Sequence, residues 1–170
     1  ECGAIKSILF QEQKVNYNPK SIDPFVGAII APTFQMLTRL SLKKFMLNAK
    51  PFIQSFNKSS HEITWHDGSI IYGLSADRPD RIEGLKLHWV WLDEVLQMSE
   101  QLFLEARART SDTKGNIMAT GSLGVQFINP KQHWAYKYFK EKPDENTSCY
   151  EWATKDNPHF PQDELESLRN

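Results

Sequence analysis

The feature that most constrains this chain is a short apolar segment, Leu87–Leu92, that ends at two adjacent carboxylates, Asp93 and Glu94. A nearly continuous apolar run of this length is typical of a parallel strand that is buried on both faces. Acidic residues that follow such a strand lie at the carboxyl edge of a sheet, where open α/β folds place their ligand sites. Taken alone, the pair is equally consistent with two solvated acids at a strand end.

The rest of the chain predicts alternating strands and helices. Further strands are expected at 25–31 and 116–119, and Asp67-Gly68 predicts a hairpin between 63–65 and 70–72. Apolar spacing and capping signals predict the remaining elements: helices at 8–15, 35–47, 99–109 (capped by Ser99) and 134–140, a strand near 148–152 and an acidic helix at 162–169. This order indicates an open, mostly parallel α/β sheet with an added β-hairpin.

Composition narrows the class of protein without naming a partner. A chain of 170 residues with 40% hydrophobic residues suits about one globular domain. The formal net charge of −1 gives no overall positive field for nucleic acid, although a motor can carry a basic surface locally. Cys2 and Cys149 lack zinc-site spacing, which indicates a reduced, intracellular protein. No apolar run approaches the roughly 20 residues that span a bilayer.

Asp93 and Glu94 have the chemistry of a magnesium-dependent hydrolase. Mg²⁺ prefers oxygen ligands and keeps several waters, so the Asp93 carboxylate is suited to hold it beside nucleotide phosphates. Glu94 points in another direction and can orient or deprotonate an attacking water. The turn Thr120-Gly121-Ser122 follows another short strand and could sense the γ-phosphate through a hydroxyl group, although a simple β-turn is the plainer interpretation.

Two further segments carry phosphate-binding residue types. Arg78 and Arg81 could bind phosphate through the guanidinium fork, or could pair with the neighbouring acids Asp77 and Asp80. The stretch Gly3-Ala4-Ile5-Lys6-Ser7 contains Lys-Ser, but a phosphate-binding loop requires G-x-x-x-x-G-K-[ST]. Ile5 stands where the second glycine should be, so this is not an intact loop as written.

The order of these segments resembles the ATPase domain of tailed-phage terminase large subunits. The resemblance rests on Ala31-Pro32-Thr33-Phe34, "ADRPDRIEG", "WVWLDEV", "ATGSL" and the closing "TKDNPHFP", and covers nearly the whole chain. It implies a P-loop NTPase fold of the ASCE/RecA-like type, which is an α/β three-layer sandwich, and hydrolysis of ATP with Mg²⁺. Asp93 would hold the metal and Glu94 would be the catalytic glutamate. Thr120, Gly121 and Ser122 would couple hydrolysis to movement.

The same resemblance implies further site residues and a domain arrangement. Arg81 falls where some members supply a trans-acting arginine, and Gly3, Lys6 and Ser7 fit the first half of the phosphate loop. In that register residues between Ser7 and Ile8 would be missing from the sequence, and Lys6 would not be the phosphate-binding lysine. The ATPase domain would span 1–155, with 156–170 leading toward a nuclease domain.

The implied role is to drive double-stranded DNA into a procapsid. The partners would be double-stranded DNA, the portal protein, the small terminase subunit and further copies in a ring, in the host cytoplasm at the portal vertex. Two other functions stay open from the sequence. A helicase-like translocase would share the acidic pair and "TGS", and a degenerate loop would leave a binding or scaffold module. Glu94→Gln is expected to keep nucleotide binding and to lose hydrolysis.

Overall fold

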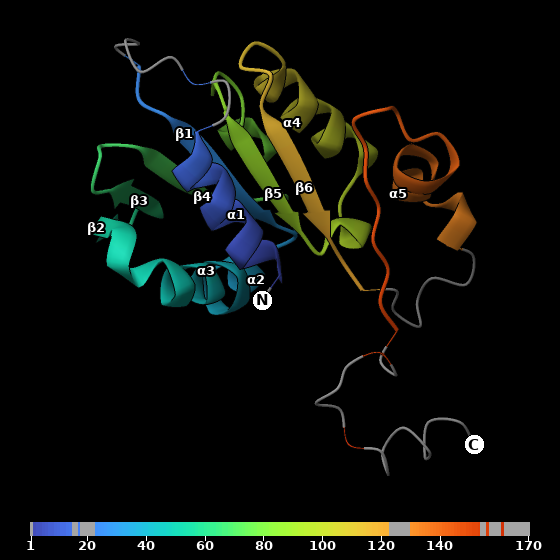
Figure 1. Ribbon diagram of the computed structural model, residues 1–170, viewed down its shortest axis with the longest axis horizontal. Helices are drawn as coiled ribbons and strands as arrows, with labels where there is room; N and C mark the ends of the chain where they lie inside the picture. Colours follow the sequence, from blue (N-terminus) through green and yellow to red (C-terminus); the bar gives the residue numbers. More distant parts are fainter. Residues whose placement is uncertain are drawn as a thin grey trace. The chain divides into compact units, whose positions relative to one another are not determined.

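Six strands form one sheet in the order β2-β3-β4-β1-β5-β6 (Figure 1). The computed structural model describes residues 2–14, 17, 23–122, 130–153, 156 and 161. Contacts divide the chain into two compact units, Glu1–Ile128 and Asn129–Asn170, and the sheet belongs to the first. The domain boundary expected after residue 155 stays a prediction.

The centre of the sheet is parallel and its hairpin side is antiparallel. The parallel strands are β4 (Ile70–Ser75), β1 (Val26–Ala31), β5 (Trp89–Asp93) and β6 (Asn116–Thr120), in that order across the sheet. The antiparallel strands β2 (Ile53–Asn57) and β3 (Glu62–Trp65) extend it beyond β4. The α/β class, the mostly parallel sheet and the hairpin at Asp67-Gly68 are therefore confirmed. Strand β2 was not predicted.

Helices cover both faces of the sheet, as a three-layer sandwich requires. On one side lie α1 (Cys2–Gln13) and a helix made of α2 (Phe34–Met36), a π-helical turn (Leu37–Ser41) and α3 (Leu42–Ala49). On the other side α4 (Glu100–Ser111) packs on β5 and β6 (Figure 1). Short 3₁₀ turns occupy residues 50–52, 79–81 and 95–97.

The second unit is helical over part of the predicted range. Residues 130–132 form a 3₁₀ turn, and α5 (Trp134–Tyr136) continues into a π-helical turn, Lys137–Glu141. This confirms the helix expected at 134–140. The strand expected near 148–152 is wrong, because those residues have no regular structure. The acidic helix expected at 162–169, and most of "TKDNPHFP", lie outside the described residues.

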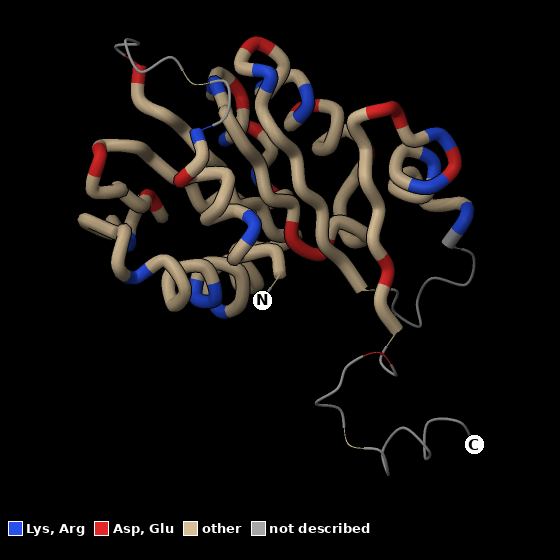
Figure 2. The backbone as a smooth tube through the Cα atoms, viewed as in Figure 1, with Lys and Arg blue, Asp and Glu red and all other residues tan. Residues whose placement is uncertain are grey.

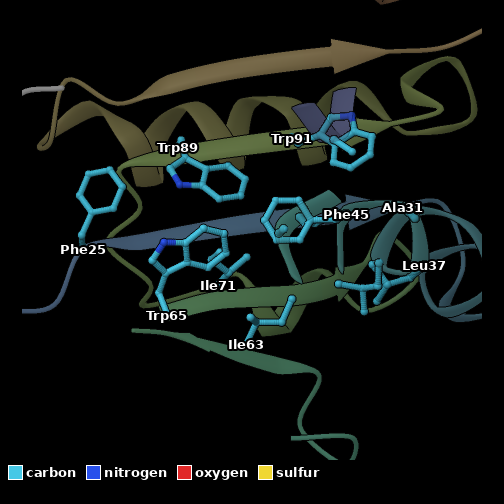
Figure 3. Packing of buried hydrophobic residues seen from close by; sticks show 13 residues of the cluster. Phe25, Ala31, Leu37, Phe45, Ile63, Trp65, Ile71, Trp89 and Trp91 are labelled. Carbon is cyan, nitrogen blue, oxygen red and sulfur yellow. The ribbon is translucent and has the colours of Figure 1, made fainter. Parts of the chain in front are cut away.

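Two glycines allow two tryptophans to fill the core between α1 and the sheet. Trp89 and Trp91 alternate on β5, so both rings point to the same face, where they are buried (Figure 3). A Cβ atom added to Gly27 would lie 2.0 Å from the Trp89 ring, and one added to Gly3 would lie 2.5 Å from the Trp91 ring. The rings therefore occupy the space that a side chain at either glycine would need, and both tryptophans pack in the core.

Indole groups and one ion pair fasten α1 to the sheet. Nε1 of Trp89 donates to Oε1 of Gln11 over 2.9 Å, and Nε1 of Trp65 donates to Oε1 of Glu12 over 2.7 Å. Beyond the end of α1, Lys14 pairs with Asp67 in the hairpin turn. Because buried polar groups are stable only when they are hydrogen-bonded, these contacts fix the position of α1 over β5.

Candidate functional site

The carboxyl ends of β5 and β6 bring the predicted acidic strand end beside the predicted hydroxyl turn. Asp93 and Thr120 are direct partners in the register of the two strands. The Thr120 hydroxyl donates to Oδ1 of Asp93 over 2.8 Å and accepts a hydrogen bond of 2.8 Å from Nε1 of Trp91. A chain of hydrogen bonds therefore runs from the buried Trp91 ring to the Asp93 carboxylate.

Ser41 is a third contributor, from an element that follows β1. Its hydroxyl donates to Oδ2 of Asp93 over 2.7 Å, so each oxygen of that carboxylate accepts a hydroxyl hydrogen. Ser41 is buried and closes the π-helical turn Leu37–Ser41. Single π-helical turns inside longer helices occur frequently at functional sites. Nothing in the sequence marks Ser41, because its contact depends on this turn and on the meeting of distant segments.

Glu94 has an uncommon backbone conformation for a residue with a side chain. Its φ of 57° and ψ of 46° lie in the left-handed region, which costs a non-glycine residue about 1–2 kcal/mol. The turn 95–97 follows at once, and Glu94 Oε2 accepts a 3.3 Å hydrogen bond from the backbone N–H of Ser122. Strain of this kind persists where the surroundings hold it, and such residues cluster at active sites.

The segment Thr120-Gly121-Ser122 therefore contacts both carboxylates. Its first residue binds Asp93 through the side chain, and its last binds Glu94 through the backbone. Between them, a Cβ atom added to Gly121 would lie 3.5 Å from the backbone nitrogen of Val95, so the segment runs close to the turn after Glu94. A displacement of this segment would change the hydrogen bonds of both acids.

The residues at this edge fit a magnesium ion held mainly by phosphate and water. Within the described ranges no group of three or more His, Cys, Asp and Glu residues could enclose a metal. Mg²⁺ in nucleotide sites needs only one or two protein carboxylates. Asp93 is half-buried, and each of its oxygens retains a second lone pair beside the hydrogen bond that it accepts.

The structure corrects the expectation of a phosphate loop at Gly3–Ser7. These residues lie in α1, which runs through Ser7 and Ile8 without interruption, so the helix expected at 8–15 begins earlier, at Cys2. Ser7 is buried, and its hydroxyl donates to the Gly3 carbonyl within the helix. The Lys6 ammonium lies over the Phe10 ring. The loop prediction was wrong because the glycine that suggested a loop serves instead to admit the Trp91 ring against α1.

The two arginines of the loop after β4 have different surroundings. Arg78 forms a bidentate pair with Asp80, which is the second of the two alternatives that the sequence left open, and both side chains are exposed. Arg81 is exposed at the end of the 3₁₀ turn 79–81 and has no ion pair among the described residues.

No described helix is long and apolar enough to cross a membrane.

Solved structures of phage large terminases share this arrangement of strands and helices. The large terminase of a thermophilic bacteriophage matches with a TM-score of 0.69 and 20% identity, over 98% of this chain and 42% of that one. The complex of that large terminase with ADP matches with a TM-score of 0.66 and 22% identity, with the same coverage. A variant ATPase domain of the Thermus phage P74-26 large terminase matches with a TM-score of 0.51 and 20% identity, over 80% and 57%.

The likeness is one of fold. No family model matches the sequence, and no curated protein matches it. The chain spans about two fifths of the length of the thermophilic-phage large terminase, 42% in the free structure and in the ADP complex. The chain therefore has an α/β fold that it shares with these phage large terminase structures.

Proposed function

We propose that this chain is the ATP-hydrolysing part of a phage terminase large subunit, the motor that drives double-stranded DNA into a procapsid. The observation that carries the proposal is the double contact of Thr120-Gly121-Ser122 with Asp93 and Glu94. In the proposed role, this contact would join the metal-holding carboxylate, the base and the coupling segment within one hydrogen-bonded group. The fold supports it, since the thermophilic-phage large terminase has been solved with ADP and with ATP-gamma-S.

Asp93 is suited to hold the magnesium that accompanies ATP. Bound Mg²⁺ would supply positive charge against the phosphate oxygens during phosphoryl transfer. The hydroxyl groups of Ser41 and Thr120 hold the Asp93 carboxylate from both oxygens and so fix its orientation. Such fixed orientation removes reorganisation at the moment of reaction, which is the main way in which charged sites accelerate it.

Glu94 is suited to accept a proton from the attacking water. Its backbone is left-handed at the end of β5, and the Ser122 N–H holds one oxygen of its carboxylate. When the γ-phosphate leaves, a shift of Ser122 would release Glu94, and a shift of Thr120 would release Asp93. In this way Thr120, Gly121 and Ser122 would pass the change to the rest of the motor.

The remaining assignments belong to the same proposal. Arg81, exposed and without an ion pair among the described residues, would reach the active site of a neighbouring copy in a ring. The portal protein and the small terminase subunit would be further partners, in the host cytoplasm at the portal vertex. Gly3, Lys6 and Ser7 contribute through the position of α1 rather than by wrapping phosphates, since they are helical.

Glu94→Gln in the full-length protein tests the proposal. The amide keeps the shape of the side chain but cannot take a proton, so kcat should fall by about 10²–10⁴-fold while nucleotide affinity changes little. Glu83→Gln, at an exposed loop position, is the matched control and should leave turnover unchanged. Near-normal turnover by Glu94→Gln would remove Glu94 as the base. Absence of both nucleotide binding and hydrolysis in the unmodified protein would favour a binding or scaffold module.

A further inference from the structure

Residues 24–61 form the most positively charged stretch of the chain. They contain Arg39, Lys43, Lys44, Lys50 and Lys58 and no aspartate or glutamate, although the whole chain has a net charge of −1. All 21 acidic residues therefore lie outside this stretch. Figure 2 shows the same imbalance, with blue and no red along α3. A stretch of this kind produces a local positive field that the net charge conceals.

Four of these residues lie on the outer side of one helical segment. Arg39, Lys43 and Lys44 are exposed on the helix Phe34–Ala49, and Lys50 is exposed in the turn that follows. The inner side of α3 is buried through Leu42, Phe45 and Ala49, so the basic side chains point away from the sheet. We name this group of four the basic helix surface.

The basic helix surface is not neutralised by the protein itself. None of its four side chains has an ion pair or a side-chain hydrogen bond in the part of the chain that the structure describes. Elsewhere in the same structure basic groups do pair, as Arg109 does with Glu105 and Lys140 with Glu151. Cations held at fixed spacing on a rigid helix, with no acidic partner beside them, favour a polyanionic ligand.

We infer that the basic helix surface binds the phosphate backbone of double-stranded DNA. From Arg39 on the helix to Lys50 in the turn after it, the segment extends about 16 Å along the helix axis. Duplex DNA carries one negative charge per about 1.7 Å of its axis, so a surface of this length can reach several phosphates. The inference rests on the proposed function for the identity of the polyanion, and it assigns the contact to particular residues.

A lipid surface fits these residues less well. An interfacial helix inserts a continuous apolar face into the membrane. Here the main apolar face of the helix is already buried against the sheet. Its exposed apolar residues do not form such a face, because Phe34 lies at its start and Leu40 and Leu47 alternate with the basic residues. The arrangement of charges therefore supports salt-dependent contact with phosphate groups and not insertion of the helix into a membrane.

The location of this surface gives it a direct connection to the candidate site. Ser41, which donates to Asp93, lies on the same helix between Arg39 and Lys43. The inner side of one helix thus contacts the metal-holding carboxylate, and its outer side carries the charges. A change in the position of Ser41 would move the DNA-contacting groups with it.

The test is the salt dependence of DNA binding in the full-length protein without nucleotide. Fluorescence anisotropy of a labelled duplex of about 30 base pairs, long enough to cover the surface, gives the association constant at several salt concentrations. Replacing all four residues by glutamine should weaken binding and reduce the slope of log K against log salt by about 1 for each phosphate contact removed. Lys86→Gln, exposed on another element, is the matched control and should keep the original slope.

The outcomes separate this inference from the proposed function. An unchanged slope in the fourfold variant overturns the inference, even if the protein hydrolyses ATP. A reduced slope supports it even if Glu94→Gln shows that Glu94 is not the base, since no nucleotide is present. The inference would also be overturned if the fourfold variant lost binding to phosphatidylserine vesicles but bound DNA as the unmodified protein does. A circular dichroism melt like that of the unmodified protein shows that the variant is folded.

Discussion

The Ser41 hydroxyl lies 2.7 Å from Oδ2 of Asp93, and this contact joins the helix after β1 to the end of β5. Thr120 holds the other oxygen of the same carboxylate from β6. Asp93 is thus the point at which three segments that are distant in sequence meet. A ligand that binds the Asp93 oxygens through their remaining lone pairs therefore shares those oxygens with both neighbours.

Ser41→Ala should weaken both the fold and the magnesium response. A hydrogen bond to a charged group contributes about 1.5–3 kcal/mol, so the free energy of unfolding should fall by an amount in or below that range. The Asp93 carboxylate would also lose one of its two positioning contacts, so more Mg²⁺ should be needed for half-maximal ATP hydrolysis. Urea unfolding and a Mg²⁺ titration of hydrolysis measure the two effects.

Thr38→Ala is the matched control for Ser41→Ala. Thr38 lies one turn earlier on the same helix, and its hydroxyl donates only to backbone carbonyls of Phe34 and Gln35. It should change the magnesium requirement little. Equal magnesium requirements in the two variants would mean that Ser41 has no role at the site.

Trp91 should report on the site through its fluorescence. Its ring N–H donates to Thr120, whose hydroxyl donates to Asp93, so a ligand at Asp93 alters the polarity around the indole. Adding Mg²⁺ with a nonhydrolysable ATP analogue should therefore shift the tryptophan emission. Trp91→Phe should bind the nucleotide and lose most of this shift. If the shift persists undiminished in Trp91→Phe, it arises at another tryptophan and the hydrogen-bonded chain does not transmit it.

The sequence predicts the site best where local pattern and sheet geometry agree. The apolar run before Asp93 and the short strand before Thr120 both read as buried parallel strands, and parallel strands end at one edge. The sequence therefore predicts that the two strand ends lie near the same edge, and the structure adds that the strands are neighbours with Asp93 opposite Thr120. The hairpin was equally readable, because Asp67-Gly68 is a local turn signal.

Contacts set by tertiary packing were beyond the reach of the sequence. Ser41 meets Asp93 only because the helix contains a π-helical turn that no residue pattern announces. Gly3 suggested a loop, but it lies in a helix, and its lack of a side chain leaves room for the Trp91 ring. Strand β2 was missed because Ile53–Asn57 has an exposed, polar centre at the edge of the sheet, with little apolar alternation.

Gly27→Ala should destabilise the fold strongly. The new Cβ atom would lie 2.0 Å from the Trp89 ring, which is fully buried and cannot move without disturbing its bond to Gln11. Overpacking of a core typically costs about 1–3 kcal/mol, and a clash this close should lie at or above the upper end. Urea unfolding measures the loss.

A second substitution distinguishes this clash from a simple backbone effect. Trp89→Leu removes the ring and destabilises the protein by itself, because it leaves a cavity. In that background Gly27→Ala should cost far less than it does in the unmodified protein, so the two changes should be strongly non-additive. Additive losses would show that Gly27 is needed for another reason.

His88 should make the fold less stable in mild acid. It is 8% exposed, and its Nδ1 accepts a 3.0 Å hydrogen bond from the Val26 N–H, which requires that nitrogen to be unprotonated. Burial lowers the pKa of His88 from its ordinary 6.5; the backbone of Val26 and the Asp23 carboxylate oppose this shift, and nearby Lys86 adds to it. Below pH 6.5 His88 is therefore protonated more readily in the unfolded chain than in the folded chain, and this difference lowers the free energy of unfolding.

The contribution of His88 to the free energy of unfolding should thus be fully present above pH 6.5. It should be lost as the pH falls below 6.5 and through the lowered pKa of His88 in the folded state. His88→Asn supplies an amide oxygen that can accept from Val26 without titrating. Urea unfolding from about pH 8 to about pH 5, a range that brackets the ordinary pKa of histidine, should show a smaller loss of stability in this variant than in the unmodified protein. His66→Asn, at an exposed turn position, is the control and should retain the full loss. Parallel curves for His88→Asn and the unmodified protein would mean that another group governs the acid response.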